Sequence, residues 1–136
     1  MLNTSRLTLL CVEDDPDISY VVKVALSLDA NIAVHQVATS EDAWTALKNG
    51  LRPSLILLDD QLVGGSGTEF AMRLQQEKCF AELPHAFLTS AGLPRDLQRF
   101  EDTGAIGVIF KPFDPTTLAD EIREMLERRT NFYLSI

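Results

Sequence analysis

The chain has 136 residues, of which 46% are hydrophobic and 24% charged, so it is long enough to form one domain with a substantial core. Its formal net charge of −8 argues against direct binding to nucleic acid, which depends on basic surfaces. The sequence has no apolar run long enough to span a membrane and does not begin like a signal peptide. Cys11 and Cys79 lack the spacing of a metal or redox pair, so we expect a reduced, cytoplasmic protein.

The N-terminal half of the chain predicts three strands and two helices. Residues 6–12 and 55–58 are short, mainly apolar stretches, which are typical of buried parallel strands, and Ile32, Val34 and Val37 mark a strand between them. Between these strands the apolar residues recur at helical spacing. Asp15, followed by Pro16, is expected to cap the first helix. Thr39 is expected to cap the second, which Asn49-Gly50 ends.

The C-terminal half continues the same alternation. A third helix, capped by Ser66 or Thr68, is followed by a strand over 84–89, and a fourth helix, beginning at Leu93-Pro94, by a strand over 106–110. Asp114 is expected to cap the last helix, with Pro115 at its first position. Residues 130–136 are expected to be a tail, either a frayed end or the start of something longer.

This alternation predicts an α/β fold, a doubly wound five-stranded parallel sheet with helices on both faces, of the flavodoxin-like kind. We expect a single domain over residues 1–129, followed by the tail at 130–136. In such sheets, ligands bind outside the carboxyl ends of the strands. The residues that follow the strands are therefore the candidates for a functional site.

Four of the expected strands end in polar side chains. Glu13 and Asp14 follow the first strand, Asp59 the third, Thr89 the fourth and Lys111 the fifth. Converging carboxylates repel one another unless a cation lies among them, and oxygen ligands without histidine favour Mg²⁺. A lysine and a hydroxyl beside such an ion are suited to phosphate oxygens. Taken singly, each of these residues also fits an ordinary helix cap, turn or loop.

The motifs at these strand ends are Val12-Glu13-Asp14-Asp15-Pro16, Leu57-Leu58-Asp59, Leu88-Thr89-Ser90 and Phe110-Lys111-Pro112-Phe113. With these motifs in this order and spacing, the chain resembles the receiver domain of two-component response regulators over nearly its full length. The resemblance implies that Asp59 accepts a phosphoryl group from the phosphohistidine of a sensor histidine kinase or a phosphotransfer protein. It further implies that Thr89 hydrogen-bonds this group and that Lys111 pairs with its oxygens.

The same resemblance implies a Mg²⁺ site and a docking face. Asp14 and Asp59 would bind the ion directly, Glu13 through water and Gln61 through its backbone carbonyl. The bond from Lys111 to Pro112 is expected to be cis. A downstream protein or a second copy would dock on the fourth helix, the fifth strand and the last helix, and we expect neither enzymatic activity nor direct contact with nucleic acid or membrane.

Two positions depart from the family pattern. Val63, followed by a glycine-rich loop, stands where the family often has proline, and Val108 stands at the family's switch aromatic. A pseudo-receiver that binds partners without phosphorylation is therefore one alternative. Enzyme-like alternatives fit less well. A flavodoxin-like protein needs a phosphate-binding loop where this chain has acids, and an aspartyl-phosphate phosphatase needs a second aspartate where Gln61 stands. His35 and His85 lie in expected strands, so we expect them to be structural.

Overall fold

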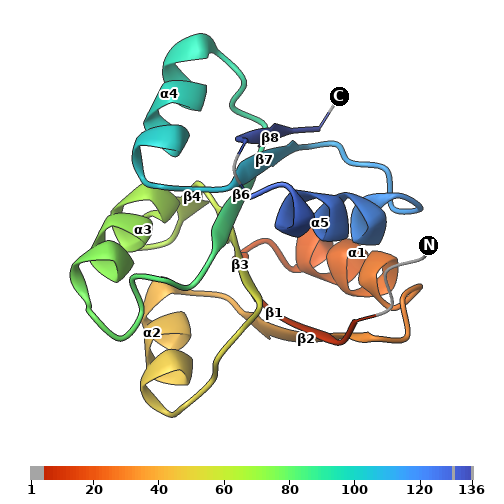
Figure 1. Ribbon diagram of the computed structural model, residues 1–136, viewed down its shortest axis with the longest axis horizontal. Coiled ribbons are helices and arrows are strands. Elements are labelled where there is room, and N and C mark those ends of the chain that lie inside the picture. Colours follow the sequence, from red (N-terminus) through yellow and green to blue (C-terminus); the bar gives the residue numbers. More distant parts are fainter. Residues whose placement is uncertain (1–4, 130, 136) are drawn as a thin grey trace.

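The computed structural model describes residues 5–129 and 131–135. Its main sheet has six strands in the order β2-β1-β3-β6-β7-β8, and every neighbouring pair is parallel (Figure 1). The strands of this sheet are β1 (Leu7–Val12), β2 (Ile32–Val37), β3 (Leu55–Asp59), β6 (His85–Thr89), β7 (Gly107–Phe110) and β8 (Tyr133–Leu134). A separate two-stranded hairpin, β4 (Gln61–Leu62) and β5 (Gly65–Ser66), follows β3.

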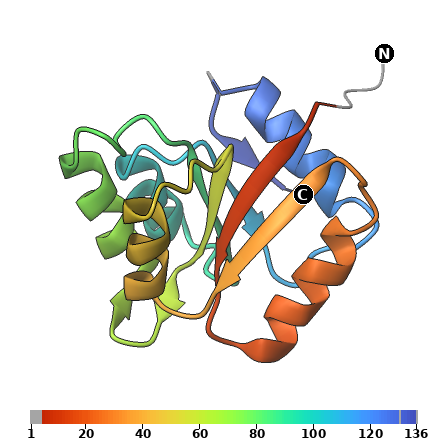
Figure 2. The ribbon, with the colours of Figure 1, turned by 90° about the horizontal axis from the view of Figure 1, so that it is seen from below.

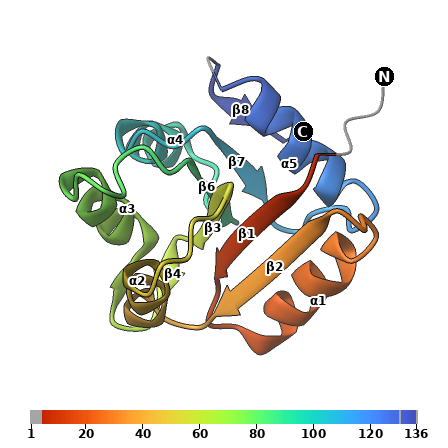
Figure 3. The same ribbon diagram turned by 60° about the horizontal axis from the view of Figure 1, so that its bottom comes forward.

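Five helices cover the two faces of the sheet: α1 (Pro16–Leu26), α2 (Ser40–Lys48), α3 (Gly67–Gln76), α4 (Pro94–Asp102) and α5 (Leu118–Glu127). Helices α1 and α5 lie on one face and the other three on the opposite face (Figures 2 and 3). Each face buries its own cluster of apolar side chains, with Leu9, Leu57 and Ile109 on the α1–α5 side and Leu10, Leu58 and Val108 on the other. The doubly wound parallel sheet expected from the sequence is therefore confirmed.

Several helices begin where their capping residues predict. The Asp15 carboxylate accepts the backbone N–H of Asp17 at 2.9 Å, with Pro16 in the first turn. Thr39 caps α2 through the N–H of Asp42, and Ser66 caps α3 through that of Glu69. The last helix differs from expectation. Asp114 accepts from Thr116 within a preceding turn, and α5 begins only at Leu118, because the Asp114 side chain closes a turn of its own.

Trp44 anchors the layer formed by α2 and α3. Its ring meets Phe70 and Phe80 edge-on, with centroid separations of 6.4 and 5.3 Å. The guanidinium of Arg73 lies 4.0 Å from the same ring. The indole is half-buried between the apolar cluster and the surface, which favours such contacts with aromatic edges and cations.

The sheet has one strand more than the sequence predicts. Within the expected tail, Tyr133 and Leu134 pair in parallel with Gly107 and Val108 to form β8. Residues 131–135 are therefore part of the fold and not a frayed end, while 130 and 136 lie outside the described residues. Two residues of strand are too short to give a periodic signal, so the pairing depends on contacts with β7 that a local pattern does not reveal.

Candidate functional site

The four central strands end at one hollow of about 460 Å³. The sheet order reverses direction between β1 and β3, and in open α/β sheets this switch point opens a crevice at the carboxyl ends of the strands. All the residues named as site candidates from the sequence line this hollow: Glu13, Asp14, Asp59, Gln61, Thr89 and Lys111. The expected convergence of these residues is thus present in the structure.

Three carboxylates lie close together in the hollow. One oxygen from each of Glu13, Asp14 and Asp59 lies within 4.8 Å of the others. Glu13 and Asp59 are only 6% and 9% exposed, so water screens their charges poorly. Carboxylate oxygens in this arrangement are the hard ligands that Mg²⁺ or a similar divalent cation prefers. These carboxylate oxygens therefore fit a hard cation. Gln61 lies beside them, and its backbone N–H donates to Asp59 Oδ1 at 3.3 Å.

Among the described residues that line this hollow, Lys111 alone carries an ammonium group. Its Nζ donates to Glu13 Oε1 at 2.8 Å and lies 3.5 Å from Asp59 Oδ2. Burial disfavours the charged lysine, but the hydrogen bond to Glu13 and the negative charges of Asp59 and Glu13 outweigh it, so the pKa of Lys111 lies above its ordinary value. The ammonium therefore remains charged beside the acids. The peptide bond from Lys111 to Pro112 is cis, as expected.

The pKa of Glu13 is raised from 4.5 to about 7. Burial is the largest cause, and the neighbouring Asp59 adds to it. The hydrogen bonds from Lys111 and from the backbone of Asp15 act in the opposite direction. Crowded acids thus hold a proton near neutral pH, which is the condition that a cation would relieve.

Thr89 lies opposite the acids at the end of β6. Its hydroxyl accepts the backbone N–H of Ala91 at 3.0 Å, and its carbonyl accepts that of Lys111 at 2.8 Å. The side chain is nearly fully buried, yet it lines the hollow. Thr89 therefore joins the loop after β6 to the end of β7, where a group bound in the hollow would meet its hydroxyl.

The end of β3 packs closely against Gly67, the first residue of α3. A Cβ at this position would lie 2.2 Å from the Asp59 carbonyl oxygen and 3.2 Å from the Asp60 Cα. The N–H of Gly67 donates to the Asp60 carbonyl at 2.7 Å. Only glycine permits this approach, so the glycine-rich stretch after β3 has a packing role that its composition alone does not specify.

Sequence reasoning missed the role of Asp60. Successive residues leave a strand on opposite sides, so Asp60 points away from the hollow that Asp59 lines. It is 7% exposed and receives two hydrogen bonds from Arg99 of α4. A buried acid directly after an apolar strand indicates a partner, but which of the chain's basic residues supplies it depends on tertiary packing.

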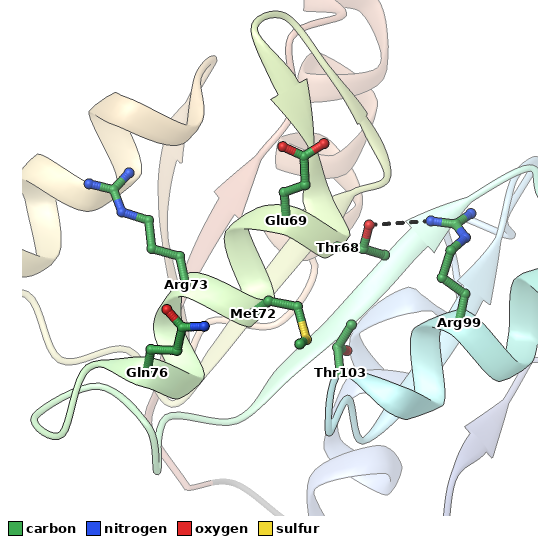
Figure 4. A pocket seen from close by; sticks show the side chains of 7 residues that line it. All are labelled: Thr68, Glu69, Met72, Arg73, Gln76, Arg99 and Thr103. Atoms are coloured by element: carbon green, nitrogen blue, oxygen red, sulfur yellow. Dashed lines mark hydrogen bonds between the residues drawn. The ribbon is translucent and has the colours of Figure 1, made fainter.

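A second hollow, of about 410 Å³, lies between α3 and α4 (Figure 4). Met72 points into it, and Arg99 reaches from α4 to the Thr68 hydroxyl at 3.3 Å. Arg73 on its rim already pairs with Glu41 at 2.8 Å. Both arginines are thus paired within the chain, and we regard this hollow as a packing feature between two helices.

The remaining ionisable candidates are structural or outside the hollow. His85 is buried and its ring Nε2 lies 2.9 Å from the Thr103 hydroxyl, as expected for a core histidine. Burial lowers the pKa of His85 to about 4, so the ring stays neutral. His35 is exposed on β2. Both cysteines are free, with Cys11 in the core and Cys79 on the surface.

Comparison with known proteins agrees with this geometry. Residues 9–123 match the family model of the response regulator receiver domain. The chain is 31% identical to response regulator Rre1 of Synechocystis over 90% of its own length and 53% of that protein. It is 35% identical to the phosphate regulon transcriptional regulatory protein PhoB of Escherichia coli over 88% of its length and 52% of that protein. The chain thus spans about half the length of these curated relatives.

Solved structures show the same likeness. A response regulator from Chloroflexus aurantiacus superposes with a TM-score of 0.81 at 27% identity, covering 91% of this chain and all of that one. The chemotaxis response regulator CheY4 of Vibrio cholerae gives a TM-score of 0.78 at 26% identity, covering 89% of this chain and 99% of that one. Among the described residues, no helix is long and apolar enough to cross a bilayer.

Proposed function

Because the chain belongs to the response regulator receiver family, we propose that Asp59 accepts a phosphoryl group from the phosphohistidine of a sensor histidine kinase or a phosphotransfer protein. The observation that carries the proposal is the convergence of Asp59 with two further acids, a hydroxyl and an ammonium in one hollow. No other hollow described for this chain combines these groups.

In the proposed reaction, a carboxylate oxygen of Asp59 forms a bond to phosphorus as the bond from phosphorus to the donor imidazole nitrogen breaks. The departing nitrogen keeps the electron pair of the broken bond, and the imidazole leaves as a neutral ring because its other nitrogen already carries a proton. Lys111 offsets the charge of the incoming phosphoryl oxygens, and the Thr89 hydroxyl is available to donate to one of them. The chain's contribution is mostly positioning and electrostatics, since the attacking group is already an anion.

Mg²⁺ is the proposed cofactor. Asp14 and Asp59 would hold it directly, Glu13 through water and Gln61 through its backbone carbonyl. When bound, the ion supplies positive charge between the acids and the phosphoryl oxygens. The raised pKa of Glu13 supports this assignment, because a site that is crowded with negative charge without an ion becomes balanced with one.

The output of the proposed receiver is protein contact and not catalysis. Phosphorylation adds charge that can draw Thr89 and the following loop inward, which would move the start of α4. Val108 is fully buried beneath α4 and has no ring to rotate. The proposed partner face is formed by α4, β7 and α5. We also propose a cytoplasmic location, which the free cysteines support.

The test is phosphorylation by acetyl phosphate with and without Mg²⁺, measured by intact mass. The wild-type chain should gain one phosphoryl group only when Mg²⁺ is present. Asp59→Asn should gain none, whereas the matched control Asp60→Asn should still be modified, because Asp60 faces Arg99 and not the hollow. A normal gain by Asp59→Asn would rule out the acceptor, and no gain by the wild-type chain would favour the pseudo-receiver alternative.

A further inference from the structure

The outer edge of β7 is covered by the chain's own C-terminal segment. β7 has four residues, of which Gly107, Val108 and Ile109 are buried. Without a neighbour on its outer side, such a strand presents unpaired N–H and C=O groups that another chain can pair with. Residues 131–135 occupy this position through β8 (Figure 1).

Backbone hydrogen bonds attach the segment along the whole edge. The N–H of Tyr133 donates to the Ile106 carbonyl at 2.9 Å, and that of Ser135 donates to the Val108 carbonyl at 3.1 Å. At the end of β7, the Ser135 hydroxyl accepts the N–H of Phe110 at 2.9 Å. The segment thus satisfies edge groups up to the residue before Lys111.

Side chains of the segment pack on both faces of the sheet. Phe132 packs against the apolar cluster on the α4 side and Tyr133 against the cluster on the α5 side. The Tyr133 hydroxyl also donates to Glu121 of α5 at 3.2 Å. Burial and the nearby Glu121 raise the pKa of Tyr133 to about 12, so this donor keeps its proton. In contrast, Leu134 is 41% exposed.

Gly107 is shaped for this contact. Its φ lies outside the left-handed region, so its backbone conformation does not require glycine. A Cβ at this position would nevertheless lie 2.6 Å from the Tyr133 carbonyl oxygen and 2.7 Å from the Tyr133 Cβ. Because glycine has no side chain, the backbone of the C-terminal segment can pack directly against β7 at this position.

We propose that residues 131–135 are the intramolecular occupant of the β7 edge and that they keep a second copy of the chain off the face formed by α4, β7 and α5. A bare β7 would meet the same edge of a second copy across a twofold axis, because identical edges are self-complementary when their strands run antiparallel. The inference rests on the proposed function only for treating this face as a partner surface. Neither phosphorylation nor Mg²⁺ enters it.

The test compares a chain that ends at residue 130 with Gly107→Ala in the full chain, both without Mg²⁺ or phosphoryl donor. The exchange rate of the Phe110 amide hydrogen should rise about tenfold or more in both variants, since the amide loses its acceptor. The matched control Leu134→Ala should change it less than about twofold, because that side chain is exposed. Gly107→Ala should have little further effect in the shortened chain, where only the flexible end of the Met125 side chain, 3.2 Å from the new methyl group, has to shift.

Sedimentation equilibrium then tests the second copy. The shortened chain and Gly107→Ala should dimerise about tenfold more tightly than wild type, while Leu134→Ala should match wild type. Unchanged exchange of the Phe110 amide would show that residues 131–135 do not protect the β7 edge. Faster exchange without tighter dimerisation would show that the segment does not prevent a second copy from binding. If the shortened chain fails to fold, Gly107→Ala and Ser135→Ala give the same test. Failure of Asp59 to accept phosphate would leave these results untouched.

Discussion

Asp60 and Arg99 form a two-pronged ion pair that ties the end of β3 to helix α4. Arg99 Nη1 lies 3.0 Å from Asp60 Oδ1, and Nη2 lies 3.0 Å from Oδ2. Asp60 directly follows the proposed acceptor Asp59, so the strand that carries the acceptor is attached to the first helix after Thr89. Asp60 also raises the pKa of Arg99, by a hydrogen bond that outweighs the cost of burial.

We predict that Arg99→Ala lowers the free energy of unfolding by about 1–2 kcal/mol, because it leaves the buried carboxylate of Asp60 without its partner. The arginine itself is partly exposed, which limits the loss. Arg95→Ala, on an exposed position of the same helix, is the control and should cost less than about 0.5 kcal/mol. Urea denaturation measures both. Equal losses in the two variants would show that the ion pair does not stabilise the fold.

Gly67→Ala should be far more damaging than its chemistry suggests. The added methyl group would collide with the backbone of Asp59, which cannot rotate away, so we expect a loss of about 3 kcal/mol or failure to fold. Gly64→Ala is the control. Its φ of +87° strains the new side chain, but nothing lies within 4 Å, and the cost should be about 1 kcal/mol. Thermal unfolding of the two variants tests this. Similar melting temperatures would contradict the close approach of Gly67 to the backbone of Asp59.

Glu13 should make the stability of the ion-free protein depend on pH. Its pKa is raised in the folded state, so the folded chain holds this proton more tightly than the unfolded chain. The resulting stabilisation is complete below pH 4.5, the ordinary pKa of Glu13, and is lost as the pH rises through about 7. Melting temperatures between these two values should therefore fall with rising pH, less steeply in Glu13→Gln. An identical slope in the variant would assign the effect to other groups.

The proton on Glu13 should compete with the binding of Mg²⁺. Because the ion requires the deprotonated acids, its apparent affinity should fall as the pH drops below about 7 and level off above it. The slope should approach about tenfold per pH unit in the acid range. Calorimetric titration at several pH values measures it, with Asp102→Asn as a control acid on α4 outside the hollow. A pH-independent affinity would mean that Glu13 gives up no proton on binding.

Lys111→Ala should fold but lose the response to phosphorylation. Lys111 lies at a strand end with its ammonium among the acids, so its removal costs little packing and should leave Mg²⁺ binding intact or tighter. Lys111→Met keeps most of the volume and separates charge from packing. Circular dichroism checks the fold, and hydrogen exchange in α4 with and without beryllofluoride checks the response. An unfolded Lys111→Ala beside a folded Lys111→Met would show that the alkyl chain is structural.

Much of this architecture follows from local signals in the sequence. Unbroken apolar runs such as Leu55 to Leu58 are buried on both faces, and Asp15 and Thr39 cap the helices as their positions predict. The site candidates converge because parallel strands end at one edge. Their chemical roles, by contrast, remain predictions that the variants above can test.

What the sequence did not reveal depends on long-range contacts. β8 forms because Gly107 admits the backbone of Tyr133, and the two lie far apart in the chain. The pairing of Asp60 with Arg99 joins residues 39 positions apart. The predicted start of α5 was wrong for a local reason. Asp114 can cap a turn as readily as a helix, and here it caps a turn before α5. Such alternatives differ only in the tertiary packing that selects one of them.

Trp44 determines what optical spectroscopy can report about this molecule. It is the one tryptophan of the chain, and it lies on α2 against Phe70, Phe80 and Arg73. None of these residues lines the acidic hollow. Its emission should therefore record the solvation of the α2–α3 layer and its loss on unfolding, while filling of the hollow stays nearly silent. A fluorescent probe for events at Asp59 has to be introduced elsewhere, for example as a tryptophan at the exposed Val63, which borders the hollow.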